Sequence, residues 1–259
     1  MEIFMSYREC VEIVRADEIA TDIYELCLET KAIAKAAKPG QFISVYSNDG
    51  SRLLPRPISI CGIDKDTLRI VYRVAGKGTK EFSEMHAGQK LDIQGPLGNG
   101  YDIEKLGSDR KAIIFGGGIG IPPMLELAKQ LDCEKNIVLG YRDELFLNDE
   151  FEKLGNVYIA TEDGSAGTKG NVLDAVRECG ITGDIIFACG PTPMLRAIKA
   201  YAEENNIEAY VSLEEKMACG IGACLACVCK SKEIDEHSQV HNKRVCKEGP
   251  VFNVKEVEL

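Results

Sequence analysis

The sequence lacks the long apolar segment that a membrane-spanning helix requires. Its longest uncharged stretch, Ala112–Leu125, has 14 residues and is interrupted by four glycines and two prolines. That stretch is too short and too irregular to cross a bilayer. The first nine residues have neither a basic start nor a long apolar core, so we expect no signal peptide. We therefore expect a soluble, cytoplasmic protein that makes no contact with a membrane.

An excess of basic residues is also missing. The chain carries 31 Lys and Arg against 41 Asp and Glu, a formal net charge of −10, and no Lys/Arg stripe is visible. Nucleic acid is therefore not an expected partner, because phosphate binding requires a basic face. There are only three histidines. His237 and His241 lie in a polar stretch without the Cys-x-His spacing of Rieske centres, and we expect both to be solvated. No nucleophile–base pair is recognisable, which argues against hydrolysis.

Cysteine, by contrast, is abundant, with 11 residues, and five of them fall between Cys219 and Cys246. An odd number scattered through apolar segments argues against a disulfide framework and for a reducing compartment. The remaining six are expected to be small buried hydrophobic residues: Cys10, Cys27, Cys61, Cys133, Cys179 and Cys189.

The spacing of the clustered cysteines predicts an iron–sulfur site. Cys219, Cys224 and Cys227 follow the pattern C-x4-C-x2-C, and Cys246 follows at a distance, as in plant-type [2Fe–2S] proteins. Small residues in the loop, among them Gly220 and Gly222, would let backbone N–H groups approach the negatively charged sulfides. The alternatives are zinc and disulfides, but structural zinc sites usually pair short cysteine spacings at both ends.

The fourth ligand has two candidates. Cys229 lies two residues after Cys227, and alternate residues of an extended segment share a face. Cys246 is favoured because the polar segment Lys230–Arg244 is predicted to form a hairpin that returns the chain to the loop.

The first part of the chain predicts a closed antiparallel β-barrel, which we delimit as residues 1–104. Turn-forming dipeptides separate six short strand-like runs, and one helical segment near Thr79–Met85 follows a Gly-x-Gly-Thr turn that could bind phosphate. The expected strands are Glu9–Arg15, Ile23–Glu29, Gln41–Tyr46, Ile58–Ile63, Leu68–Val74 and Lys90–Gln94.

After about Asp109 the pattern changes to alternating strands and helices, which predicts a doubly wound α/β nucleotide domain over residues 105–213. The turn Gly116-Gly117-Gly118-Ile119-Gly120 follows the first buried strand and suits a dinucleotide pyrophosphate. Ile121 stands where the usual fingerprint has its third glycine, so a tight turn without a ligand is the alternative. The remaining residues, 214–259, would form a small [2Fe–2S] segment.

Two short strings identify the family that this arrangement resembles. Arg56-Pro57-Ile58-Ser59 resembles the flavin-binding signature of the ferredoxin–NADP reductase superfamily, and Cys189-Gly190-Pro191-Thr192-Pro193-Met194 resembles its nicotinamide-side motif. With Val71-Tyr72-Arg73, Gly78-Thr79, the cysteine loop and Glu248-Gly249-Pro250-Val251-Phe252, nearly the whole chain resembles the electron-transfer subunits of dihydroorotate dehydrogenase B.

The resemblance implies an oxidoreductase subunit of pyrimidine biosynthesis that carries FAD, a [2Fe–2S] cluster and NAD(H). Its partner would be an FMN-containing dihydroorotate dehydrogenase catalytic subunit, in a heterotetramer of two plus two chains. Arg56 would face the FAD pyrophosphate, and Ser59 would lie near the reactive flavin nitrogen. Cys189 would lie beside the nicotinamide. The other expected cofactor-binding residues are Pro57, Ile58, Val71, Tyr72, Arg73, Gly78, Thr79, Gly116, Gly117, Gly118, Gly120, Gly190 and Pro191, and the metal ligands are Cys219, Cys224, Cys227 and Cys246.

Two other functions share some of these features. The small FAD/[2Fe–2S] subunit of a flavin-bifurcating ferredoxin–NADP transhydrogenase or of a sulfhydrogenase would carry almost the same motifs. A non-catalytic zinc-binding module would need only the cysteines. For the nicotinamide, Asp143 and Glu144 follow Arg142 after the second α/β strand, and the acidic pair favours the 2′-hydroxyl of NADH over the 2′-phosphate of NADPH.

Overall fold

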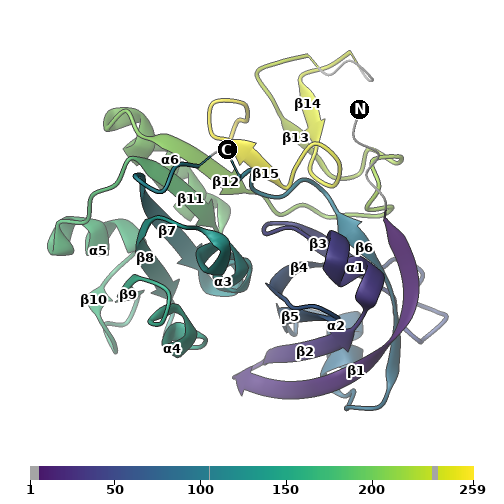
Figure 1. The fold of residues 1–259 in the computed structure, drawn as a ribbon. Coiled ribbons are helices and arrows are strands. Elements are labelled where there is room, and N and C mark those ends of the chain that lie inside the picture. Colours follow the sequence, from purple (N-terminus) through teal and green to yellow (C-terminus); the bar gives the residue numbers. More distant parts are fainter. Residues whose placement is uncertain (1–5, 105, 235–238) are drawn as a thin grey trace.

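The computed structural model describes residues 6–104, 106–234 and 239–259. The N-terminal part is the expected six-stranded antiparallel barrel, closed in the order β1-β2-β5-β4-β3-β6 (Figure 1). Alternate residues such as Ile13, Leu26 and Ile70 point inward and fill its core. The strands are β1 (Tyr7–Ala20), β2 (Ile23–Glu29), β3 (Phe42–Val45), β4 (Arg56–Ile63), β5 (Thr67–Arg73) and β6 (Lys90–Leu97).

Two short helices accompany the barrel. Helix α2 (Lys77–Ser83) lies where the sequence predicted a helical segment, although it begins two residues earlier. Helix α1 (Lys31–Ala36), between β2 and β3, was not predicted. Its six residues are too few to show a helical period, and it is stabilised by burying Ile33 and Ala34 against the barrel core.

The second part is a doubly wound α/β domain, as predicted. A seven-stranded sheet in the order β10-β9-β8-β7-β11-β12-β15 is covered by α3 and α4 on one face and by α5 and α6 on the other (Figure 1). The strands are β7 (Lys111–Gly117), β8 (Glu134–Tyr141), β9 (Asn156–Thr161), β10 (Thr168–Lys169), β11 (Ile185–Cys189), β12 (Glu208–Ser212) and β15 (Val251–Asn253). The helices are η1 (Gly118–Gly120), α3 (Ile121–Gln130), α4 (Asn148–Phe151), α5 (Val172–Cys179) and α6 (Thr192–Glu204).

The C-terminal segment is built into both other parts. The predicted hairpin forms from β13 (Val228–Lys230) and β14 (Asn242–Arg244). Strand β15 then pairs antiparallel with β12 at the edge of the nucleotide-domain sheet, and Phe252 joins that domain's core. On the barrel side, the Asn99 N–H donates to the Gly249 carbonyl at 2.6 Å. The segment therefore connects the barrel to the α/β domain.

Charged side chains bridge the seam between barrel and α/β domain. Arg69 on β5 donates two hydrogen bonds of 2.7 Å to Glu150 on α4. It also contacts Glu25, which is only 2% exposed and contacts Arg15 as well. Nearby, the Ile63 N–H donates to the Glu126 carboxylate at 2.9 Å. These contacts link the barrel directly to α3 and α4.

None of the helices in the described ranges has the length and apolar character needed to cross a membrane.

Candidate functional site

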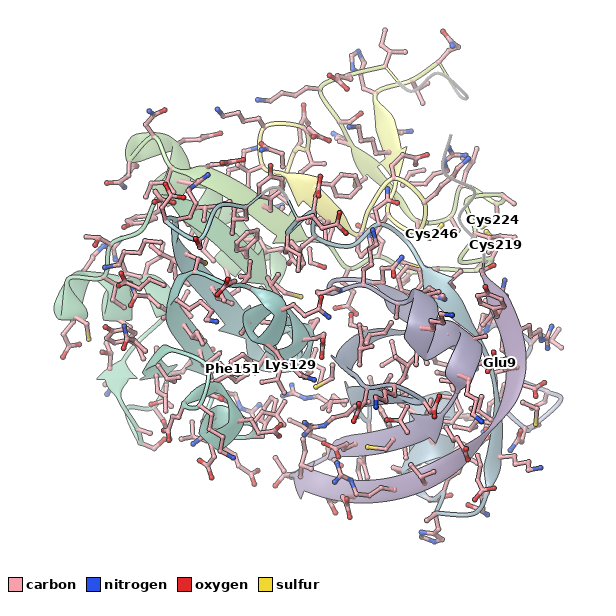
Figure 2. The ribbon with its side chains drawn as sticks, in the orientation of Figure 1. Glu9, Lys129, Phe151, Cys219, Cys224 and Cys246 are labelled. Atoms are coloured by element: carbon pink, nitrogen blue, oxygen red, sulfur yellow. The ribbon has the colours of Figure 1, made fainter. Side chains whose placement is uncertain are left out.

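The cysteine loop aims backbone amides at sulfur. The N–H groups of Ile221 and Ala223 donate to Cys219 Sγ at 3.5 and 3.3 Å. The Gly222 N–H donates to Cys246 Sγ at 3.1 Å. Figure 2 shows Cys219, Cys224 and Cys246 close together beside the barrel. The loop and the distant Cys246 therefore meet, and the amides surround the sulfurs with partial positive charge.

A backbone amide also links two of the thiol-bearing residues, since the Cys246 N–H donates to Cys227 Sγ at 3.4 Å. Burial raises the pKa of Cys219, but hydrogen bonds from the loop amides and from Cys224 outweigh it and bring that pKa to about 7. Thiolate is the form that binds metal. In the described part of the chain, no three His, Cys, Asp or Glu side chains converge as the site of a single metal ion requires, whereas each iron of a [2Fe–2S] cluster takes only two protein ligands.

Glycine is required at two positions of this loop. Gly220 and Gly222 have φ of +69° and +82°, a conformation that favours glycine. A Cβ on Gly222 would come within 2.7 Å of the Lys247 side chain, and one on Gly220 within 3.0 Å of Ser44 Oγ on β3. The loop thus packs directly on the barrel strand that pairs with β4.

An ion pair between a buried arginine and a partly buried glutamate supports the back of the loop. Arg244, at the end of β14, is 8% exposed. Its Nε donates to Glu248 at 3.0 Å, and its Nη1 donates to the Gly222 carbonyl at 3.0 Å. Burial alone would raise the pKa of Glu248, but hydrogen bonds from Arg244 outweigh it and hold that pKa below its usual value. This role of Arg244 is not visible in the sequence, because nothing in the string Lys243-Arg244-Val245 marks a buried charge.

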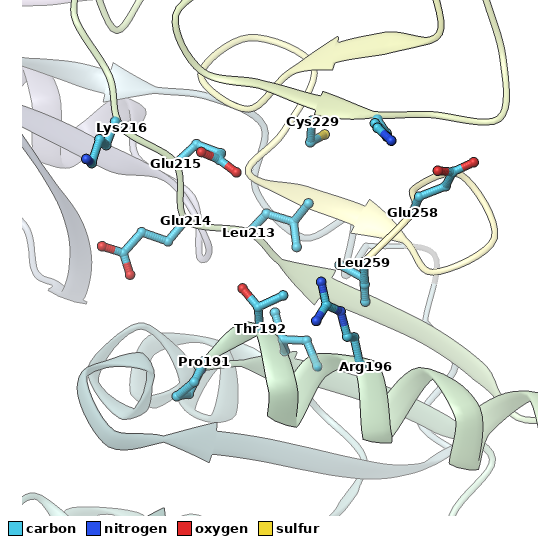
Figure 3. A pocket seen from close by; sticks show the side chains of 13 residues that line it. Pro191, Thr192, Arg196, Leu213, Glu214, Glu215, Lys216, Cys229, Glu258 and Leu259 are labelled. Atoms are coloured by element: carbon cyan, nitrogen blue, oxygen red, sulfur yellow. The ribbon is translucent and has the colours of Figure 1, made fainter.

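Cys229 lies elsewhere. It lines a cavity of about 590 Å³ between α6 and the C-terminal segment, together with Thr192, Arg196 and Leu259 (Figure 3). Burial raises the pKa of its thiol to about 11.

Of the two histidines expected to be solvated, His241 lies at the surface, with its ring Nδ1 3.0 Å from the Lys232 carbonyl oxygen. His237 lies outside the described residues.

The predicted flavin residues converge at one end of the barrel. Because β4 and β5 are adjacent and antiparallel, the start of β4 and the end of β5 meet there, and α2 follows β5. The Arg56 guanidinium lies over Gly78, where an added Cβ would be only 2.1 Å from Arg56 Nε. Its Nη1 donates to the Leu54 carbonyl at 2.6 Å. Pro57, Ile58 and Ser59 continue along β4, with Ile58 buried.

Two of the predicted flavin residues at this end, Tyr72 and Thr79, differ in whether their hydroxyl groups have hydrogen-bond partners. The Tyr72 hydroxyl on β5 is buried and has no hydrogen-bond partner among the described residues. By contrast, Thr79 Oγ1 accepts hydrogen bonds from the Ala75 and Gly76 N–H groups at 2.9 and 3.1 Å. The Thr79 hydroxyl therefore already caps α2. Val71 packs toward the α/β domain, and Arg73 is exposed at the strand end.

The two predicted nucleotide turns lie side by side at the carboxyl ends of β7 and β11, which are adjacent parallel strands. A Cβ on Gly120 would be 2.4 Å from the Cys189 carbonyl oxygen, and one on Gly117 would be 2.5 Å from Met194 Sδ. These two glycines are therefore needed for packing within the protein. Gly118 differs, since it has φ of +52° and open space where a Cβ would lie.

Cys189 is partly buried in this region, and desolvation raises the pKa of its thiol to about 12. It is therefore a neutral thiol at physiological pH.

Directly after β8, the strand beside β7, Arg142 Nε donates to Asp143 at 3.2 Å. Hydrogen bonds from the Glu144 N–H and from Arg142 hold the pKa of Asp143 below its usual value.

Residues 214–258 match the family model described as the iron–sulfur cluster binding domain of dihydroorotate dehydrogenase B. Among solved structures, the chain resembles one described as an NADH-dependent reduced ferredoxin–NADP oxidoreductase. The TM-score is 0.84 and the identity 29%, over 96% of this chain and 90% of that one.

Two curated relatives are similar over nearly their whole length. Both are named dihydroorotate dehydrogenase B (NAD(+)), electron transfer subunit. The protein from Geobacillus sp. (strain WCH70) is 43% identical over 264 residues, covering 98% of this chain and all of the relative. The protein from Fusobacterium nucleatum subsp. nucleatum is 42% identical over 254 residues, covering 93% and 95%. With the barrel, the α/β domain and the cysteine loop in the same order, the chain belongs to the family of dihydroorotate dehydrogenase B electron transfer subunits.

Proposed function

We propose that this protein relays electrons between NAD(H), FAD and a [2Fe–2S] cluster, to or from an FMN-containing dihydroorotate dehydrogenase subunit. Cys219 and Cys224 would bind one iron, and Cys227 and Cys246 the other; the Cys246 N–H donates to Cys227 Sγ at 3.4 Å. Cys229 would not be a ligand, because it lines a separate cavity.

The barrel end would hold FAD. Arg56 would pair its guanidinium with the pyrophosphate, and Gly78 is needed because any side chain there would displace Arg56. Thr79 would contribute its backbone amide, since its hydroxyl is used in capping α2. Pro57, Ile58, Ser59, Val71, Tyr72 and Arg73 complete the proposed site. When bound, a flavin supplies the conversion between hydride transfer and single-electron transfer.

The turns after β7 and β11 would hold the nicotinamide nucleotide. Gly118 offers the open backbone position. Gly117 and Gly120 permit the close packing of the two turns, and Gly116 leaves room for Ile121 at the start of α3. Cys189, Gly190 and Pro191 would lie beside the nicotinamide. As a neutral thiol, Cys189 would orient the ring by contact and would not attack it.

We assign NADH as the nucleotide. The Arg142 guanidinium is already paired with Asp143, and Asp143 and Glu144 would repel a 2′-phosphate.

The partner would dock over the cluster loop. Two large apolar side chains next to the exposed Cys224 face solvent, Ile221 with 52% and Leu225 with 40% exposure. Leu225 has φ of +59°, an unusual conformation for leucine that recurs where function maintains strain. Burial of these side chains by the catalytic subunit would exclude water from the electron path. We also propose that the protein assembles with its partner into a heterotetramer of two plus two chains and that it is cytoplasmic.

One observation carries this function. Cys246 lies at the C-x4-C-x2-C loop, and that loop packs on the barrel strand next to β4. The test is to co-express the chain with its catalytic subunit and to assay the purified complex anaerobically. Flavin, iron and acid-labile sulfide should be present, and NADH should reduce orotate only when both subunits are present. The isolated chain should reduce an artificial dye with NADH. A colourless, zinc-containing protein would refute the proposal in favour of a zinc-binding module.

The structural likeness at TM-score 0.84 also favours a second candidate, the small subunit of a flavin-bifurcating ferredoxin–NADP transhydrogenase. The sulfhydrogenase subunit is a related alternative. The protein that co-purifies from the native host decides between them. A partner that binds FMN and oxidises dihydroorotate supports the first function, and one that reduces ferredoxin supports the second.

A further inference from the structure

The ion pair of the buried Arg244 with the partly buried Glu248 is linked to the proposed cluster through one peptide unit. The Arg244 guanidinium is held by Glu248 through Nε, at 3.1 and 3.0 Å to the two carboxylate oxygens, and through Nη2. The Arg244 N–H also donates to Glu248 at 2.7 Å. With several fixed contacts on one side, the guanidinium directs Nη1 to the Gly222 carbonyl at 3.0 Å.

That carbonyl belongs to the peptide unit between Gly222 and Ala223. The N–H at the other end of the same unit donates to Cys219 Sγ at 3.3 Å. A hydrogen bond accepted by a peptide carbonyl polarises the unit and makes its N–H a stronger donor. A cationic donor has a larger effect than a neutral one. Arg244 thus orients and polarises an amide that points at a proposed ligand sulfur, although it does not touch the sulfur itself.

Hydrogen bonds to ligand sulfurs are among the features that set the potential of an iron–sulfur cluster. Such a bond stabilises the added negative charge of the reduced state, so it makes reduction easier. We propose that Arg244 is a positioning residue that raises the cluster's reduction potential through the Gly222–Ala223 peptide, with Glu248 fixing its guanidinium. The inference rests on the proposed [2Fe–2S] site at Cys219, Cys224, Cys227 and Cys246.

The test is a redox titration of the complex, following the reduced cluster by electron paramagnetic resonance. Arg244→Met removes the donor. Arg244→Lys keeps the charge, but the single ammonium group of lysine cannot contact both Glu248 and Gly222 as the planar guanidinium does. Both should have a lower midpoint potential than wild type, measured per assembled cluster. The matched control is Lys243→Met, which removes a neighbouring positive charge that is paired with Glu256 at 2.7 Å. Its potential should equal that of wild type.

Three results would overturn the inference. The first is an unchanged midpoint potential in both Arg244 variants. The second is an equal shift in Lys243→Met, because the effect would then be one of general charge. The third is failure of both Arg244 variants to hold a cluster even after reconstitution with iron and sulfide, because Arg244 would then serve assembly alone. A wild-type protein without the [2Fe–2S] signal would instead refute the proposed function, and the inference with it.

Discussion

Replacing Gly78 with alanine should separate flavin binding from folding. An alanine Cβ at this position would lie 2.1 Å from Arg56 Nε and 2.3 Å from Arg56 Cζ, whereas carbon atoms in contact are normally about 3.5–4 Å apart. The guanidinium must therefore move by more than about 1 Å. This movement costs the folded state little free energy, because a long, partly exposed side chain can rotate away. Alanine also suits the first turn of α2 better than glycine, by about 0.5–1 kcal/mol.

Gly78→Ala should therefore weaken FAD binding and stabilise the fold. Displacing the guanidinium removes charge-assisted hydrogen bonds worth about 1.5–3 kcal/mol, which weakens FAD binding by about 10- to 150-fold. The FAD-free protein should meanwhile melt roughly 1–4 °C higher, if about 0.5–1 kcal/mol converts at the usual rate for a chain of this size.

The assay is FAD titration of the apoprotein by fluorescence quenching, with a double-mutant cycle of Gly78→Ala and Arg56→Ala. In the Arg56→Ala background the clash is gone, so Gly78→Ala should have no further effect on affinity. An equal loss in both backgrounds would mean that alanine obstructs FAD directly. Unchanged affinity in all variants would refute the assignment of Arg56 to the flavin.

Three further predictions concern the cluster and the domain seam. Single Ser substitutions at the proposed ligands should abolish the iron–sulfur absorbance, whereas Cys229→Ser should retain it; retention in a ligand variant would exclude that residue. The ligands to be replaced are Cys219, Cys224, Cys227 and Cys246. Glu25→Ala should lower the free energy of unfolding by about 1.5–3 kcal/mol, measured by urea titration, because two arginines lose charge-assisted contacts with a buried carboxylate; a change well under about 1 kcal/mol would contradict this. Hydrogen bonds from Arg69 lower the pKa of Glu150, so its stabilising effect is present above the ordinary pKa and is lost as the pH falls through the lowered one. Melting temperatures between about pH 6 and 3 should therefore fall less steeply in Glu150→Gln than in wild type, and parallel curves would count against the pairing.

The C-terminal segment affects how the cluster should be tested. Removing everything after Leu213 deletes all four proposed cluster ligands. The structure shows that such a cut also removes β15 from the sheet edge and takes the buried Phe252 and Val254 out of the nucleotide-domain core. Loss of activity in a truncated chain would then report unfolding as well as loss of the cluster. Point substitutions at the cysteines avoid this ambiguity.

Most of the fold could be predicted because its elements carry strong local patterns. The barrel strands carry alternating or apolar runs between turn residues, and the first α/β strand is a buried apolar run, Ala112–Phe115, followed by a glycine turn. The elements that were missed are short. Helix α1 has six residues, β10 has two and β15 has three. Segments of this length form through tertiary contacts, such as the burial of Ile33 or the pairing of Val251 with Ser212, and so leave no periodic signal.

By itself the sequence determined what chemistry the chain can carry, because spacing within one loop limits the geometry of its side chains. The spacing of the C-x4-C-x2-C loop indicated an iron–sulfur cluster for this reason, whereas the Arg56–Ser59 string indicated FAD through its resemblance to a flavin-binding signature. Only the tertiary structure decided which distant groups join them. Cys229 lines a separate cavity, and the Arg244 guanidinium lies behind Gly222. Cys246, which the predicted hairpin favoured, lies at the loop. Those placements depend on how the hairpin, β15 and the barrel pack together, and packing between segments far apart in the chain is not encoded in any local pattern.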